Sequence, residues 1–173
     1  MLDIDGVVSL FGFPPHAPPA GSFHSIDGIP HFLSAAAAHH LPALGEIFEL
    51  VWCSGWEERA NEYLPGLLGL SGELPFLRFA PAVRAASAVS GSRSGSGVID
   101  TDRFTRGHWK LAAIDAHAGT RPLAWIDDCL DDACRAWAAA RVAPTLLVQT
   151  QAAIGITDGH VQELVRWAGC ATL

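Results

Sequence analysis

The sequence predicts an α/β fold: a doubly wound parallel sheet of about five strands with helices on both faces. Short apolar segments alternate with amphipathic or alanine-rich segments along most of the 173 residues. That alternation is typical of βαβ units, whose strands run parallel. Half of the residues are hydrophobic, which argues for a packed core and against disorder. The length favours a single domain over residues 1–173.

Strands are expected at the five apolar segments 1–8, 46–53, 74–79, 121–126 and 144–149. Helices are expected over residues 30–44, 57–64, 107–118, 130–141 and 157–168. Ser54, Asp128 and Thr157 each precede one of these helices and are candidate caps. Pro75 places the third strand near an edge of the sheet, or is the first residue of that strand.

Two segments fit neither pattern. Residues 9–30 are rich in Pro, Gly, Ser and aromatic residues, which predicts a flap or small lid beside the end of the first strand. His16 and His24 in this segment, and His31 just after it, are expected to face solvent. Residues 80–106 contain a Gly/Ser run and predict a flexible loop. Arginines in this loop could help to hold an anionic substrate, although solvated side chains are the simpler interpretation.

Charge and composition exclude several classes of function. The net charge of −7 works against non-specific attraction to nucleic acid or to an anionic membrane. No apolar run is long enough to span a bilayer, and the acidic start does not resemble a secretory signal, so a cytoplasmic location is expected. The four cysteines have no zinc-finger spacing, and Cys53 and Cys134 are expected to be buried and reduced. No stable protein partner is predicted, and the oligomeric state stays open.

The first eight residues place two carboxylates at a strand end. Residues two apart on a strand point to the same face, so Asp3 and Asp5 are expected to project together. Neighbouring buried carboxylates repel each other, and one must take a proton unless a cation is present. Gly6 then allows a sharp turn or a close approach to a ligand. A surface turn is the alternative, since Asp and Gly are common in turns.

Other polar residues follow later strands. Ser54 and Gly55 could offer a hydroxyl and a backbone N–H to an anion, or Ser54 could act only as a cap. Lys110 lies near the start of a helix, where a cation is unfavourable, so it is expected to face a negative group. Asp127 and Asp128 end the fourth strand. Alternatively, these acids only stabilise the first turn of the next helix. This alternative explains Asp127 poorly, because Asp127 directly follows the apolar segment of the strand.

Ligands of open parallel sheets bind outside the carboxyl ends of the strands, where all these residues are expected. Clustered carboxylates favour a hard divalent cation, and Mg²⁺ commonly accompanies phosphate. Aspartate can also act as a covalent nucleophile in aspartyl-phosphate chemistry. The sequence therefore predicts a site for a phosphorylated substrate with Mg²⁺ as cofactor.

The motifs resemble, in order, those of the haloacid dehalogenase (HAD) superfamily of phosphohydrolases. The matching segments are Leu2 to Val8, Val51 to Ser54, Lys110, and Trp125 to Asp128. Residues 52–64 and 109–114 further resemble a group of uncharacterised bacterial, especially actinobacterial, HAD-domain proteins. A related HAD domain is associated with RNA-repair proteins. No insertion is large enough for a full cap domain, so the resemblance is to small-cap or capless members.

The resemblance implies a Mg²⁺-dependent phosphomonoester hydrolase. It implies that Asp3 attacks phosphorus, and that Asp5 protonates the leaving group and then activates water. It also implies phosphate binding by Ser54, the N–H of Gly55 and Lys110. The implied metal ligands are the Asp3 carboxylate, the Asp5 carbonyl, Asp127 and Asp128, the last directly or through water.

Only Met1 and Leu2 precede Asp3, whereas the first strand of the superfamily is normally longer. Either the true start lies upstream or the strand is shortened. Two alternatives to a small-molecule phosphatase therefore stay open. One is a phosphate-binding or interaction module with little turnover, and the other is an RNA-end-processing phosphatase. The substrate is accordingly a phosphorylated small molecule or a nucleic-acid end. A dehalogenase is less compatible with Asp5 and the paired acids.

Overall fold

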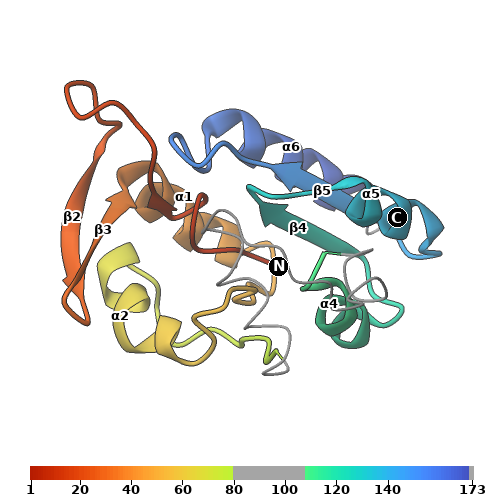
Figure 1. Ribbon diagram of the computed structural model, residues 1–173. Coiled ribbons are helices and arrows are strands. Elements are labelled where there is room, and N and C mark those ends of the chain that lie inside the picture. Colours follow the sequence, from red (N-terminus) through yellow and green to blue (C-terminus); the bar gives the residue numbers. More distant parts are fainter. Residues whose placement is uncertain (80–107, 172–173) are drawn as a thin grey trace, which may run out of the picture.

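The computed structural model describes residues 1–79 and 108–171 (Figure 1). The loop predicted at residues 80–106 lies outside the described residues. The regular elements are β1 (Ser9–Leu10), β2 (Gly21–Ile26), β3 (Ile29–Ser34), α1 (Ala35–Gly45), α2 (Arg59–Leu68), α4 (Leu111–Ala118), β4 (Leu123–Asp127), α5 (Asp132–Ala140), β5 (Thr145–Gln149) and α6 (Asp158–Ala171).

The parallel part of the fold is centred on β4 and β5. These strands pair in parallel from Leu123 opposite Thr145 to Asp127 opposite Gln149. Isolated parallel bridges continue the pairing, from Ile126 to Leu2, from Leu2 to Trp52, and from Trp52 to Phe76. The first three predicted strands are thus present as single parallel bridges, shorter than the regular strands predicted for these segments.

Local backbone bonds explain why these three segments stay short. After Asp5 the chain turns at once, because the N–H groups of Val7, Val8 and Ser9 all donate to the Ile4 carbonyl. In the second segment, the N–H groups of residues 46–48 donate to the last carbonyls of α1, so pairing starts only near Val51. In the third, Pro75 has no N–H to donate and only its carbonyl accepts, from Trp52.

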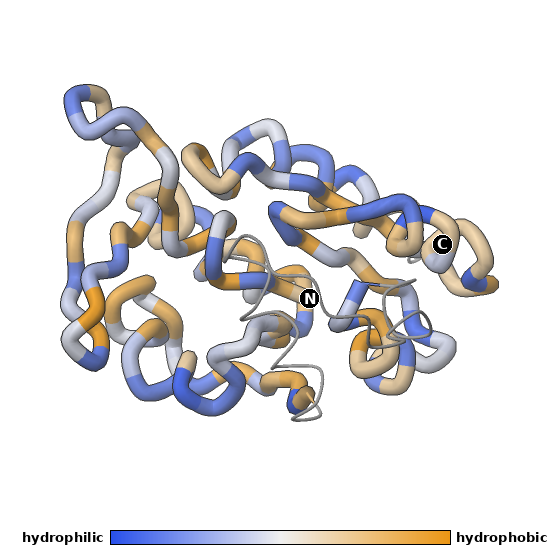
Figure 2. The backbone as a smooth tube through the Cα atoms, in the orientation of Figure 1, coloured by the Kyte–Doolittle hydropathy of each residue, from blue (hydrophilic) through white to orange (hydrophobic). Residues whose placement is uncertain are grey.

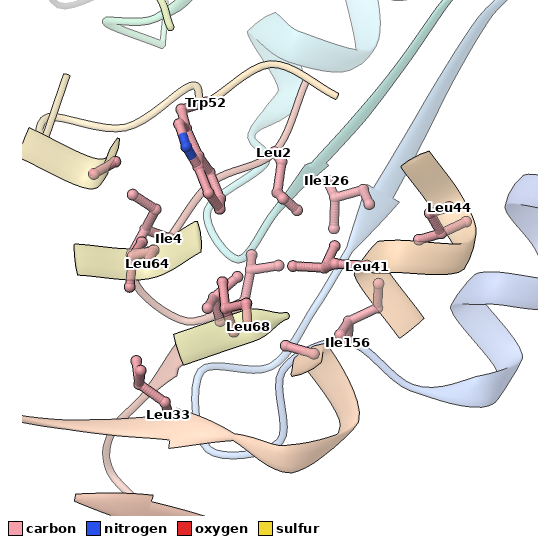
Figure 3. Packing of buried hydrophobic residues seen from close by; sticks show 14 of the residues in the cluster. Leu2, Ile4, Leu33, Leu41, Leu44, Trp52, Leu64, Leu68, Ile126 and Ile156 are labelled. Carbon is pink, nitrogen blue, oxygen red and sulfur yellow. The ribbon is translucent and has the colours of Figure 1, made fainter. Parts of the chain in front are cut away.

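Apolar side chains pack on two sides of the parallel pairings. Leu2 lies between Trp52 and Ile126 in a cluster that α1, α2 and α6 complete (Figure 3). The neighbouring residues Cys53 and Trp125 belong to a second cluster, which includes residues of α4 and α5. Alternation along an extended chain explains this division, because successive side chains point to opposite faces.

Residues 9–34 form an antiparallel sheet with the order β1-β3-β2. Asp27 and Gly28 connect β2 to β3 with φ angles of 52° and 77°, as a two-residue type I′ turn requires. The predicted helix start at Pro30 is therefore wrong, since residues 30–34 pair in β3. Helix α1 begins at Ala35 instead, and the Ser34 hydroxyl caps it by accepting from Ala37 N.

Two of the three predicted helix caps, Ser54 and Asp128, are wrong. Helix α2 begins at Arg59, with no side-chain cap bond, because residues after Ser54 first form a turn. Helix α5 is capped by Asp131, which accepts from Cys134 N at 2.8 Å, and not by Asp128. Thr157 does accept from His160 N at the start of α6, as predicted. Among the described helices, none combines the length and apolar character that crossing a membrane requires.

Candidate active site

Three carboxylates meet where β4 ends. Asp3, Asp127 and Asp128 each offer an oxygen, and these oxygens lie within 4.8 Å of one another. The pairing explains the meeting: Leu2 bridges to Ile126, so the next residues, Asp3 and Asp127, follow at the same edge. Figure 2 shows the tube of β4 changing from hydrophobic to hydrophilic at this end.

Lys110 connects two of these acids. Its Nζ lies 2.6 Å from Asp3 Oδ2 and 2.7 Å from Asp127 Oδ2, and the residue is only 3% exposed. Burial disfavours the charged amine, but the two carboxylates together outweigh it and hold the pKa of Lys110 above its ordinary value. The position of Lys110 just before α4, where a cation is unfavourable, is thus explained by the negative groups it faces.

Backbone and indole groups fix the two acids that contact Lys110. Asp3 Oδ1 accepts from Ile4 N at 2.8 Å. Asp127 accepts from Cys129 N at 2.9 Å and from the Trp125 indole at 3.2 Å. Burial raises the pKa of Asp3 to about 7, while the Lys110 charge acts in the opposite direction. Both carboxylates are therefore held in fixed orientations.

Gly6 makes room for Asp128. Its φ is 74°, and a Cβ at this position would lie 2.4 Å from Asp128 Cγ. The carbonyl of Gly6 accepts from the Thr150 hydroxyl at 2.8 Å. Burial also raises the pKa of Asp128. A residue with any side chain would be strained here and would displace the third acid.

Asp5 has a separate partner. Its Oδ2 accepts from the Trp56 indole at 3.0 Å, and the His31 ring packs edge-on against that indole with centroids 4.7 Å apart. Burial raises the pKa of Asp5, and the Trp56 bond and the proximity of His31 lower it in part. Asp5 is thus not part of the cluster formed by Asp3, Asp127 and Asp128, although only one residue separates it from Asp3.

Ser54 and Gly55 reach the same edge. Cys53 N donates to the Leu2 carbonyl at 2.8 Å, so Ser54 follows the paired segment next to Asp3 in the sheet. Ser54 is buried and Gly55 is exposed. A Cβ on Gly55 would lie 3.9 Å from the ring of Trp109, the residue before Lys110. The structure therefore brings the Ser54 and Lys110 segments together.

The sequence did not reveal the partners of these acids. His31 was expected in solvent, but it is partly buried, and its Nδ1 lies 3.1 Å from Ser9 Oγ. No sequence signal pairs Trp56 with Asp5, and Trp125 lies within a predicted strand. One usable signal was available, the Asp27-Gly28 pair. It is typical of a hairpin turn, and this hairpin carries His31 to Trp56.

The donor set fits a divalent cation. The three clustered carboxylates of Asp3, Asp127 and Asp128 face the single amine of Lys110, so negative charge is in excess. Hard oxygen donors of this kind suit Mg²⁺. Without such an ion, these acids would repel an incoming phosphate dianion. The arrangement can therefore hold a cation and, with it, an anionic substrate.

Most of the chain matches a family model. Residues 1–161 match the model described as "HAD domain in Swiss Army Knife RNA repair proteins". No curated protein and no solved structure gave a significant match. The matched range includes every acid of the cluster, Lys110, Ser54 and Gly55. The chain therefore belongs to the HAD superfamily, in the family of HAD domains of Swiss Army Knife RNA repair proteins.

Proposed function

We propose that this protein is a Mg²⁺-dependent phosphomonoester hydrolase that acts through an aspartyl-phosphate on Asp3. The observation that carries the proposal is the meeting of Asp3, Asp127 and Asp128 around the buried amine of Lys110. Membership of the HAD superfamily supports a hydrolase at the family level. Phosphoryl transfer depends mainly on positioning and on neutralising charge, and this group of residues supplies both.

The proposal includes the fold. The parallel pairings run in the order Phe76, Trp52, Leu2, β4 and β5. This order supports a doubly wound five-stranded sheet in a single domain over residues 1–173. The site then occupies the crevice at the carboxyl edge, where ligands of such sheets bind.

Two chemical steps follow from the residues. In the first, an Asp3 oxygen attacks phosphorus, the bond from phosphorus to the leaving oxygen breaks, and protonated Asp5 gives its proton to that oxygen. In the second, Asp5 takes a proton from water as the water oxygen attacks phosphorus, and Asp3 leaves as the free carboxylate. The indole of Trp56 orients Asp5 for both transfers.

The remaining residues bind and neutralise the phosphate. The Ser54 hydroxyl and the Gly55 N–H donate to phosphoryl oxygens, and the Lys110 amine offsets negative charge on Asp3. Asp3, Asp127, Asp128 and the Asp5 carbonyl would hold Mg²⁺. When bound, the ion supplies positive charge to the phosphoryl oxygens in the transition state.

A phosphate at an RNA end is the second candidate substrate. The family's association with RNA repair proteins favours it. The net charge of −7 argues against broad electrostatic binding of a long RNA. Recognition of the terminal nucleotide alone is compatible with that charge. A binding module without turnover is the remaining alternative, and hydrolysis measurements separate it from both phosphatases.

The test is phosphate release, with and without Mg²⁺, from small phosphomonoesters, nucleotides and phosphate-ended RNA oligomers. Asp3→Asn is expected to abolish Mg²⁺-dependent release. Asp132→Asn, which changes a fully exposed acid outside the cluster, is expected to leave it intact. Absence of release from the folded wild-type protein with every substrate would refute the enzyme and favour the binding module.

A further inference from the structure

A cavity of about 210 Å³ lies between the β2–β3 hairpin and the start of α2, two elements that Figure 1 shows side by side. We call it the hairpin pocket. Residues of the hairpin form one wall, and the chain after Ser54 with α2 forms the other. The lining residues are Ile26, Asp27, Ile29, His31, Gly55, Trp56, Arg59 and Tyr63.

The hairpin pocket adjoins the candidate active site through shared residues. Trp56 lines the pocket and also donates to Asp5 Oδ2. Gly55 lines it as well, and its N–H is a proposed phosphate donor. On the proposed mechanism Asp5 protonates the leaving group, so the leaving group approaches Asp5, whose partner Trp56 lines this pocket.

The charged side chains that line the pocket neutralise each other. Arg59 forms an ion pair with Asp27, and the Tyr63 hydroxyl donates to the same carboxylate at 2.7 Å. Apart from His31, the other lining side chains are uncharged. No unpaired arginine or lysine lines the pocket among the described residues, so a second phosphate on the leaving group gains little there. The charge balance favours an uncharged ligand.

The lining side chains favour a flat ring. Trp56, His31 and Tyr63 offer aromatic surfaces, and Ile26 and Ile29 offer apolar ones. Nucleobases bind proteins by stacking on aromatic rings and by hydrogen bonds along their edges. The Tyr63 hydroxyl, which donates to Asp27, can still accept a hydrogen bond from a base edge. The volume is below the roughly 300–1,000 Å³ of pockets for drug-sized ligands, which suits a small group such as one base.

We propose that the hairpin pocket binds the nucleobase of the terminal nucleotide whose phosphate is hydrolysed at Asp3. This inference rests on the proposed function and adds the means of recognition: the nucleotide, or the RNA end, is held through its base. The hairpin is then one wall of the substrate site. The base stacks on the aromatic side chains, and the ribose spans the distance to Asp5.

The first arm of the test measures binding of the four ribonucleosides by calorimetry. Nucleosides carry no phosphate, so this arm is independent of hydrolysis. Ile29→Glu places a charge in the pocket at a residue that is 59% exposed, and it is expected to weaken nucleoside binding about tenfold or more. Ile47→Glu is the matched control, since Ile47 is 49% exposed and does not line the pocket.

The second arm compares kcat/KM for nucleoside monophosphates, ribose 5-phosphate and phenyl phosphate. The kcat/KM for nucleotides is expected to exceed that for ribose 5-phosphate by about tenfold or more, and Ile29→Glu is expected to reduce that ratio.

If hydrolysis depends on Mg²⁺ but nucleosides do not bind and the ratio is near one, the pocket inference is overturned and the proposed function stands. Phenyl phosphate hydrolysed as well as nucleotides, without nucleoside binding, also overturns it. Nucleoside binding that Ile29→Glu weakens, without hydrolysis of any substrate, supports the pocket and overturns the phosphatase.

Discussion

The indole of Trp56 donates to Asp5 Oδ2 over 3.0 Å, and the same indole forms part of the wall of the hairpin pocket. Asp5 is the acid proposed to protonate the leaving oxygen. Trp56 therefore positions this acid and also lines the pocket proposed for the leaving group. A hydrogen bond to a charged group contributes about 1.5–3 kcal/mol. This bond is expected to matter more for catalysis than for folding.

Trp56→Phe keeps an aromatic ring and removes the donor to Asp5. We expect kcat to fall about tenfold or more with a small change in KM, because the bond positions the proton-transfer group rather than the phosphate. Steady-state kinetics with a nucleotide checks this. Trp137→Phe is the matched control, since Trp137 donates to Asp115 at 2.9 Å on the surface. An equal loss of kcat in both variants would contradict the positioning role.

Gly6→Ala tests the space that Asp128 occupies. The new Cβ would meet Asp128 Cγ at 2.4 Å, and positive φ adds a backbone cost of about 1–2 kcal/mol. We expect the variant to bind Mg²⁺ more weakly, in addition to being less stable. Gly12→Ala is the control, because Gly12 has a φ of 76° with no atom within 4 Å of an added Cβ. If both variants bind Mg²⁺ alike, Gly6 contributes only backbone conformation.

The acids and Lys110 were predictable from the sequence because their signals are local. Asp127 ends an apolar run and Asp3 lies within another, and the parallel pairing of Leu2 with Ile126 brings both acids to one edge. Lys110 was expected to face a negative group because it precedes a helix, and the structure supplies two such groups. These predictions required the order of motifs along the chain but no side-chain packing.

The partners of Asp5 depend on tertiary contacts that no spacing encodes. His31 reaches Trp56 because an Asp-Gly turn folds β3 back on β2, and the proline-rich composition of residues 9–30 concealed that hairpin. Strand lengths failed for a related reason. Whether an apolar run pairs at one residue or at five depends on nearby bonds, such as those from Val7, Val8 and Ser9 to Ile4.

Lys110→Met removes the amine between two buried carboxylates. Losing one partner of a buried ion pair costs about 3–5 kcal/mol, because charge is left without compensation. We expect a loss of that size in the free energy of unfolding, measured by urea denaturation without Mg²⁺. Arg121→Met is the control, since the Arg121–Glu49 pair is exposed and contributes under about 1 kcal/mol. Similar losses in both variants would argue that Lys110 is not structurally essential to the acid cluster.

Mg²⁺ is expected to raise the melting temperature, because a ligand that binds only the folded state stabilises it by mass action. Asp128→Asn removes one charged donor to the ion. The Mg²⁺ concentration that gives half of the maximal rise in melting temperature should therefore increase about tenfold. Differential scanning fluorimetry over a Mg²⁺ series measures it. Asp132→Asn should retain the wild-type midpoint, since that acid is fully exposed. A shift that is identical in both variants would place the ion elsewhere.

The four cysteines are expected to divide into two pairs by reactivity. Cys53 and Cys134 are buried, and burial raises the pKa of each thiol to about 12, so almost no thiolate forms near neutral pH. Cys129 and Cys170 are exposed. Alkylation followed by mass spectrometry should modify only the exposed pair in the native protein and all four after denaturation. Rapid native labelling of Cys53 would contradict the packing beneath Ser54, because that thiol lies in the cluster completed by α4 and α5.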